Sequence, residues 1–107
     1  MDDGRQQRFR EMTADRNRKV LDAACRLAED KGLAGVTRDA VADAAGVSAG
    51  TASAAYGDMH ELREAVMREA VSRPLLRVLA QGLASGHATA RAAPDELRQR
   101  ALETVSA

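Results

Sequence analysis

The stretch of the chain from residue 37 to residue 56 constrains the fold most, because a glycine separates two short helical segments there. Thr37 is a good N-cap for a helix through Ala45, and Ser48 is a good N-cap for a helix through about Tyr56. Gly46 can adopt the left-handed backbone conformation that a tight turn between helices needs. The pattern predicts a helix-turn-helix unit.

The side chains in this stretch satisfy the packing that such a unit requires. Ala42 lies five positions before Val47 and is small enough to let the two helices cross closely. We expect Val41, Val47 and Tyr56 to face inward and to fix the crossing angle. The second helix would then protrude, and a protruding helix of this kind can enter the major groove of DNA.

Helices are predicted on both sides of this unit. A first helix, capped by Thr13 or Asp15, shows apolar residues at helical spacing and stops at Gly32. After Gly57, Asp58 and Glu61 form a capping-box-like pair for a fourth helix.

The last third of the chain predicts two further helices. Pro74 marks either the first turn of a fifth helix, which runs to Gly86, or a kink at its start. Residues 87–93 are a loop or a helical extension, and Pro94 opens a last helix with a stripe of Leu97, Ala101 and Val105. The sequence therefore predicts an all-α fold, a small bundle of five to six helices, with a helix-turn-helix domain at 13–72 and a short helical tail at 73–107 that packs on the domain or dimerises.

Composition limits the size of the core and shows where the positive charge lies. The chain has 107 residues, of which 45% are hydrophobic, and alanine dominates that fraction. Such a composition favours closely packed helices over a sandwich or a large ligand cavity. The net charge is zero, but bases crowd the first nineteen residues. Residues 1–12 lack periodicity and predict a flexible basic arm.

Several classes of function find no support in the sequence. The single cysteine, Cys25, allows no internal disulfide, and no cluster has metal-ligand spacing. Ser53, His60 and Asp58 lack a scaffold for nucleophilic catalysis, so we expect no enzyme and no cofactor. The polar amino terminus is unlike a signal peptide, and no apolar run is long enough to span a membrane, which predicts a cytoplasmic protein.

Four blocks in order, Val20–Leu27, Lys31–Leu33, Ala45–Thr51 and Tyr56–Leu62, resemble the amino-terminal domain of the TetR family over about residues 16–70. The helix-turn-helix segment alone is also similar to the LacI family. The TetR resemblance implies a homeodomain-like helix-turn-helix that binds double-stranded DNA and a transcriptional regulator, in particular a repressor.

The chain departs from the TetR pattern at several positions that usually grip phosphate or fill the core. Ala49 replaces a usual lysine or arginine, residues 52–55 are Ala-Ser-Ala-Ala, and Met59 replaces a usual lysine. Ala28 stands at a usual phenylalanine, and Arg38 at a usually apolar position. Base readout would therefore depend on small hydroxyl and methyl groups and on DNA shape.

The candidate DNA-contacting residues come from the first helix, the helix-turn-helix and the start of the fourth helix. They are Arg16, Arg18, Lys19, Thr37, Arg38, Ser48, Ala49, Gly50, Thr51, Ser53, Ala54, Tyr56 and His60. Alternatives remain for five of them: Thr51, Ser53 and His60 as solvated surface, Arg38 as a cover for the core, and Tyr56 as a core residue. The arm would contact phosphate or the minor groove.

The tail is shorter than the second domain that usually binds an inducer and dimerises in TetR-like repressors. Two short helices are not expected to enclose a drug-sized pocket, so we expect no small-molecule inducer and a possible homodimer. Small regulators of this type suggest a phage or mobile-element origin. The alternatives are a protein–protein adaptor with weakened DNA contacts, which the alanines at 49, 52, 54 and 55 favour, and an accessory factor in transposition or recombination.

Overall fold

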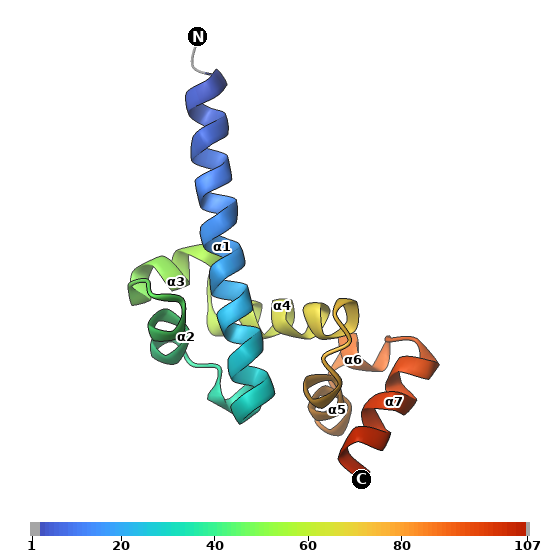
Figure 1. Cartoon of the computed structure of the whole chain (residues 1–107). Helices are drawn as coiled ribbons and strands as arrows, with labels where there is room; N and C mark the ends of the chain where they lie inside the picture. Colours follow the sequence, from blue (N-terminus) through green and yellow to red (C-terminus); the bar gives the residue numbers. More distant parts are fainter. Residues whose placement is uncertain (1–2, 107) are drawn as a thin grey trace.

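The computed structural model describes residues 3–106, and this part of the chain is all-α (Figure 1). The sequence predicted this fold class. The described residues contain seven α-helices and one 3₁₀ turn. The elements are α1 (Asp3–Lys31), η1 (Leu33–Gly35), α2 (Arg38–Ala45), α3 (Ala49–Tyr56), α4 (Met59–Ser72), α5 (Leu76–Ala84), α6 (Ala88–Arg91) and α7 (Asp95–Ser106).

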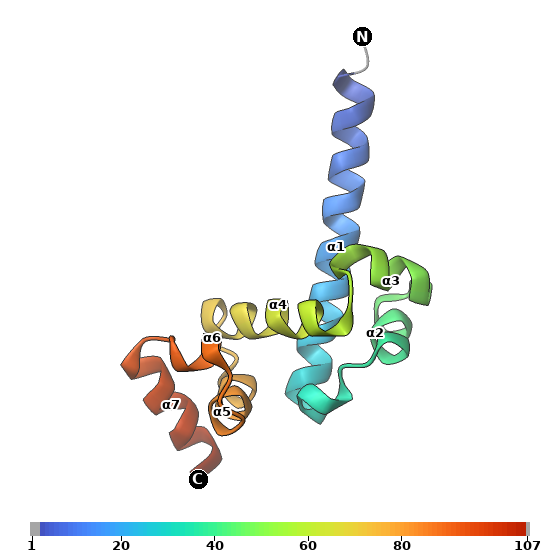
Figure 2. The ribbon, with the colours of Figure 1, turned by 180° about the vertical axis from the view of Figure 1, so that it is seen from behind.

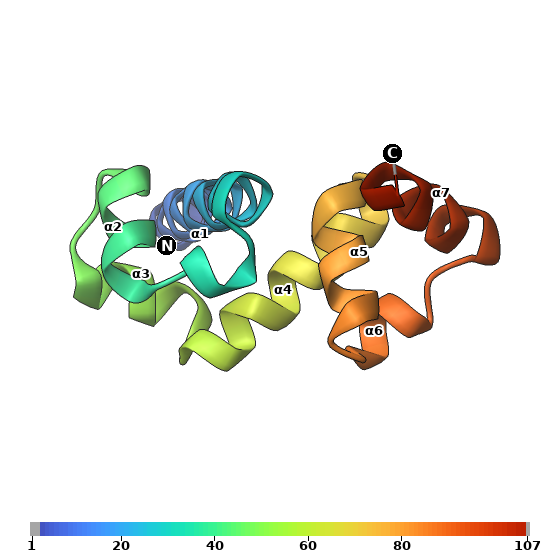
Figure 3. The ribbon, with the colours of Figure 1, turned by 90° about the horizontal axis from the view of Figure 1, so that it is seen from below.

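The helices form two groups that α4 connects (Figure 3). On one side, α2 and α3 pack against α1, and on the other side α5, α6 and α7 pack together and against α4. One continuous apolar core runs through both groups. Its largest fully buried side chains are Met67, Leu79, Val20, Val36, Val41, Val66 and Val78.

The expectation of a flexible arm at residues 1–12 is corrected over the residues that the structure describes. Asp3–Met12 form the first turns of α1, and residues 1–2 lie outside the described part. Neither Thr13 nor Asp15 therefore begins a helix. The physical reason is that arginine, glutamine, glutamate and methionine are good helix formers, and no stop signal separates residues 3–12 from the periodic segment that follows.

The predicted boundaries of the central helices agree with the structure. The helix α1 ends before Gly32, whose φ is 82°, and Gly46 ends α2 in the left-handed conformation at φ 70°. Thr37, Ser48 and Asp58 each accept a hydrogen bond from a backbone amide three residues later. These short-range caps set where α2, α3 and α4 begin.

The tail differs from its prediction in three respects. Residues 88–91 form a one-turn helix, α6, so the described chain has more helices than the five to six expected. Pro74 lies in the connection between α4 and α5, before the first turn of α5. The helix α5 ends at Ala84 and not at the predicted Gly86. Val105 is 61% exposed, so the stripe of α7 is buried only at Leu97 and Ala101.

Candidate nucleic-acid interface

The turn between α2 and α3 has the geometry that a helix-turn-helix requires. The amide of Val47 donates to the carbonyl oxygen of Ala42 at 2.9 Å and closes the turn around Gly46. Val41 and Ala42 are buried against the core, while Val47 is half-buried. The small side chain of Ala42 allows the close approach, as the sequence predicted.

The start of α3 is held by a pair of hydroxyl groups. Ser48 Oγ accepts from the amide of Thr51 at 3.1 Å and donates to Thr51 Oγ1 at 2.9 Å. A hydroxyl group can both donate and accept, so Thr51 Oγ1 keeps hydrogen-bonding capacity beyond this contact. The cap therefore orients the Thr51 hydroxyl as well as fixing where α3 begins.

The helix α3 exposes part of its surface at the end where Ser48 lies. Ser48, Gly50 and Ala54 are exposed, whereas Ala49, Thr51 and Ser53 are half-buried. Ala52 is buried against the neighbouring helices. The tail helices α5–α7 lie at the other end of the molecule from α3 and do not cover it (Figures 1 and 3).

The predicted cations of α1 fall on two different faces of that helix. Arg16 and Lys19 line a groove of about 330 Å³ together with Met12, Thr13, Asp15 and Val47, so they lie beside the turn that leads into α3. Arg18 lines a different groove, of about 410 Å³, between α1 and α4 with Tyr56, Glu69 and Arg73. The structure thus groups Arg16 and Lys19 with α3 and separates Arg18 from them.

The remaining polar candidates flank the helix-turn-helix. Arg38 is the first residue of α2 and His60 the second residue of α4, and both are exposed. Thr37 is also exposed, and its hydroxyl caps α2 at 3.3 Å from the amide of Ala40. Their contact with DNA stays a prediction.

Tyr56 ends α3 and packs half-buried against the core. Burial raises the pKa of its phenol, and the nearby carboxylate of Glu69 acts in the same direction. The phenol is therefore neutral at physiological pH. The geometry fits the core alternative for Tyr56, with the hydroxyl near the groove between α1 and α4.

Two structural supports of this interface carry no signal in the sequence. Arg63 Nη2 in α4 donates to the carbonyl oxygen of Val36 at 3.1 Å, directly before the Thr37 cap, and so fixes the entry into α2. Met12 and Thr13 line the groove beside Val47. A contact between residues 27 positions apart depends on how α4 packs, so no local pattern indicates it.

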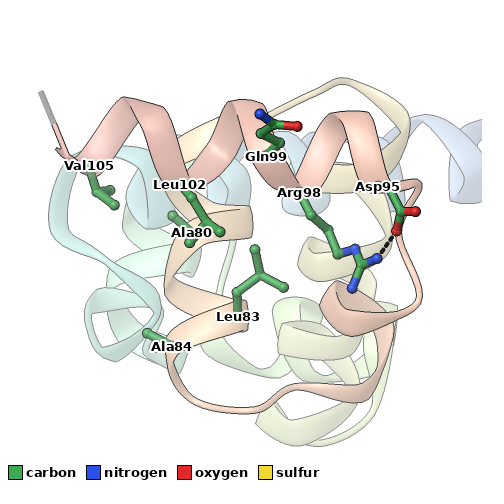
Figure 4. A pocket seen from close by; sticks show the side chains of 8 residues that line it. All are labelled: Ala80, Leu83, Ala84, Asp95, Arg98, Gln99, Leu102 and Val105. Carbon is green, nitrogen blue, oxygen red and sulfur yellow. Dashed lines mark hydrogen bonds and ion pairs between the residues drawn. The ribbon is translucent and has the colours of Figure 1, made fainter.

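A further groove lies in the tail, between α5 and α7 (Figure 4). It measures about 570 Å³ and is lined mainly by apolar side chains, including Ala80, Leu83 and Leu102. The sequence predicts no enclosed pocket of drug size here. The groove has such a volume, but Leu102 is 51% exposed and Val105 61%, so α7 leaves it open to solvent.

Other kinds of site are not evident within residues 3–106. No group of three or more histidine, cysteine or acidic side chains in this range is placed to hold a metal ion. Over the same range, no helix combines the length and hydropathy that crossing a bilayer would require.

The capped turn and the exposed start of α3 define a helix-turn-helix domain of a DNA-binding protein. Residues 20–66 match the family described as bacterial regulatory proteins, tetR family, and this segment is a TetR-family helix-turn-helix domain. The predicted resemblance is thereby confirmed over residues 20–66. Comparisons with curated proteins and with solved structures gave no match. The family description gives no support for a phage or mobile-element origin.

Proposed function

We propose that this protein is a sequence-specific transcriptional regulator, acting as a repressor, that lays α3 in the major groove of double-stranded DNA. The observation that supports the proposal best is the start of α3, where the Ser48–Thr51 pair is held at an exposed helix end that the tail leaves open. A repressor of this kind acts by occupying a promoter.

Base readout in this proposal uses small groups. The helix α3 has no arginine, asparagine or glutamine for two-point contacts to a base. Thr51 and Ser53 would donate or accept single hydrogen bonds, and the exposed methyl group of Ala54 would contact a thymine methyl. Sequence-dependent DNA shape would supply the rest of the specificity.

Contacts to phosphate would supply most of the affinity. Arg16 and Lys19 lie beside the turn into α3, and Arg38 and His60 are exposed at the starts of α2 and α4. Each neutralised phosphate releases counterions, so binding should weaken as salt rises. Because the net charge is zero, this local grouping and not the whole protein would attract DNA.

A homodimer would strengthen binding, because two helix-turn-helix units related by a twofold axis read two half-sites about 34–36 Å apart. The exposed side chains of Leu102 and Val105 give α7 an apolar edge that a second copy would cover. We propose no small-molecule inducer, and we place the protein in the cytoplasm, where a bacterial regulator meets chromosomal DNA.

Selection of duplexes from a random pool with the full chain tests this function. We expect an enriched sequence, and we expect the double variant Thr51→Val, Ser53→Ala to lose about tenfold or more in affinity for it, since it removes two single hydrogen bonds worth about 1 kcal/mol each. Thr104→Val is the matched control, because its hydroxyl lies on α7 and donates to the carbonyl oxygen of Arg100.

The alternative is a protein–protein adaptor, which the alanines of α3 favour. Larger polar side chains would give α3 more contacts with DNA than it gains from Ala49, Ala54 and Ala55. If the protein bound no duplex even at low salt, the adaptor would replace the regulator. Enrichment without sequence preference would instead support an accessory factor that holds DNA only through phosphate.

A further inference from the structure

The amino-terminal half of α1 projects beyond the rest of the molecule as a single helix (Figures 1 and 2). The projection runs from Asp3 to about Met12, which borders Val47 in a groove, and at 1.5 Å per residue it is about 15 Å long. Both views show that it leaves the domain on the side where α3 lies, away from the tail helices. A 55 Å longest dimension of the chain reflects this projection.

One face of this helix carries a stripe that is mostly basic. Arg8, Met12, Arg16 and Lys19 follow one another at spacings of four, four and three residues, so their side chains share one face. All four are exposed, and Met12 is 70% exposed. Arg10 is also exposed, but it lies two residues after Arg8 and therefore points to another side of the helix.

The stripe leads directly to the start of α3. Met12, Arg16 and Lys19 line the groove that Val47 closes, and Val47 immediately precedes the Ser48 cap. A duplex held by α3 would thus lie alongside the stripe.

We propose that the projecting half of α1 is a second DNA contact, a rigid helical rail that lies along the sugar–phosphate backbone next to the base-reading site of α3. This inference depends on the proposed function. Arg8, Arg16 and Lys19 bind phosphates, and Met12 packs against sugars between them. Arg8 and Arg16 lie about 12 Å apart along the helix axis, so they reach different phosphates of that backbone.

A matched pair of single variants tests the face of the helix. Arg8→Gln and Arg10→Gln remove the same charge from neighbouring exposed positions of one helix. We expect Arg8→Gln to lower the slope of log affinity against log salt by about 0.9, the value for one lost phosphate contact, and Arg10→Gln to leave it unchanged. Equal effects of the two variants would overturn the proposal, because a diffuse positive charge does not distinguish faces.

A second variant tests whether the rail must be rigid. Proline at position 14 removes a helical hydrogen bond and its ring clashes with the preceding turn, so Ala14→Pro uncouples residues 3–13 from the rest of α1. We expect its salt slope to fall at least as much as that of Arg8→Gln. Ala14→Ser is the control. A wild-type slope for Ala14→Pro, with an unchanged melting temperature, would show a flexible arm and reject the rail.

The two proposals fail in different ways. If the wild-type chain binds no duplex at all, both the proposed regulator function and the proposed second DNA contact of α1 are rejected. In the other case, the wild type binds a selected sequence with an affinity that the Thr51→Val, Ser53→Ala change lowers. If Arg8→Gln and Arg10→Gln then change the salt slope equally, only the second DNA contact of α1 is rejected. Circular dichroism of each variant shows whether the fold is retained.

Discussion

The backbone amide of Leu33 donates a hydrogen bond to Gln81 Oε1 at 2.8 Å, which joins the turn after α1 to α5 across 48 residues of sequence. Leu33 begins η1, and Gln81 is half-buried in α5. This bond connects the helix-turn-helix group of helices to the tail. The tail therefore supports the DNA-binding domain through a polar contact as well as through the shared core.

Replacing Gln81 by alanine should destabilise the whole chain. The change leaves the amide of Leu33 without its partner in a partly buried place, which costs about 1–2 kcal/mol of unfolding free energy. Chemical denaturation measures the loss. Gln99→Ala, at an exposed position of α7, is the control and should change stability little. Equal stability of the two variants would show that water replaces Gln81 at no cost.

Gly46 should resist replacement because of its backbone and not because of crowding. A Cβ there would meet nothing within 4 Å, but φ is 70°, which costs an alanine about 1 kcal/mol or more. Gly50→Ala is the matched control, because Gly50 lies in the first turn of α3 with a helical backbone, where alanine is the better helix former. The melting temperature should fall for Gly46→Ala and rise for Gly50→Ala. A change in the same direction for both variants would contradict the prediction.

Gly82 should resist replacement for the opposite reason. Its backbone is helical, but a Cβ would lie 2.5 Å from Met67 Cε and 2.8 Å from the Cβ of Ala90, so α5 packs against α4 and α6 there without space for a methyl group. We expect Gly82→Ala to cost about 1–3 kcal/mol, as overpacking does in other cores. A neutral result in denaturant titration would mean that α6 moves aside freely.

The thiol of Cys25 should be unreactive in the folded protein and should make stability fall at high pH. Burial raises its pKa from the ordinary 9.0 to about 11, and its exposed fraction is 3%. Because the folded state holds this proton more tightly, the contribution is complete below pH 9 and is lost as the pH rises towards 11. The two-unit difference corresponds to at most about 3 kcal/mol.

Cys25→Ala provides the comparison for that titration. The variant removes the thiol while keeping a small apolar side chain, so its unfolding free energy should decline less between pH 9 and pH 11 than that of the wild type. A thiol-directed reagent at pH 8 should label the wild type only on unfolding. Rapid labelling of the folded chain, or parallel pH curves for the two proteins, would disprove the raised pKa.

Short-range sequence signals predicted the helix-turn-helix in detail, but they failed where helices have no local stop or start signal. The caps at Thr37, Ser48 and Asp58 each act over three residues, so their pattern is visible in the sequence. Residues 3–12 lack such a cap and are helical, while the helix at 88–91 begins at His87, whose Nδ1 accepts from the amide of Thr89 at 3.2 Å, a cap of a residue type that the sequence pattern does not indicate. Of the candidate contacts, periodicity placed Arg16 and Lys19 on α1, but it did not show that they border Val47.

The sequence by itself determined the all-α class, the turn at Gly46 and the boundaries of α2, α3 and α4, because capping and left-handed glycine are local properties of the backbone. Only the tertiary structure decided that Arg16 and Lys19 border the start of α3 while Arg18 lies by α4, and that Arg63 holds Val36 and Gln81 holds Leu33. These relationships join distant parts of the chain, and they depend on the angles at which helices pack around a shared core, which no single segment of sequence specifies.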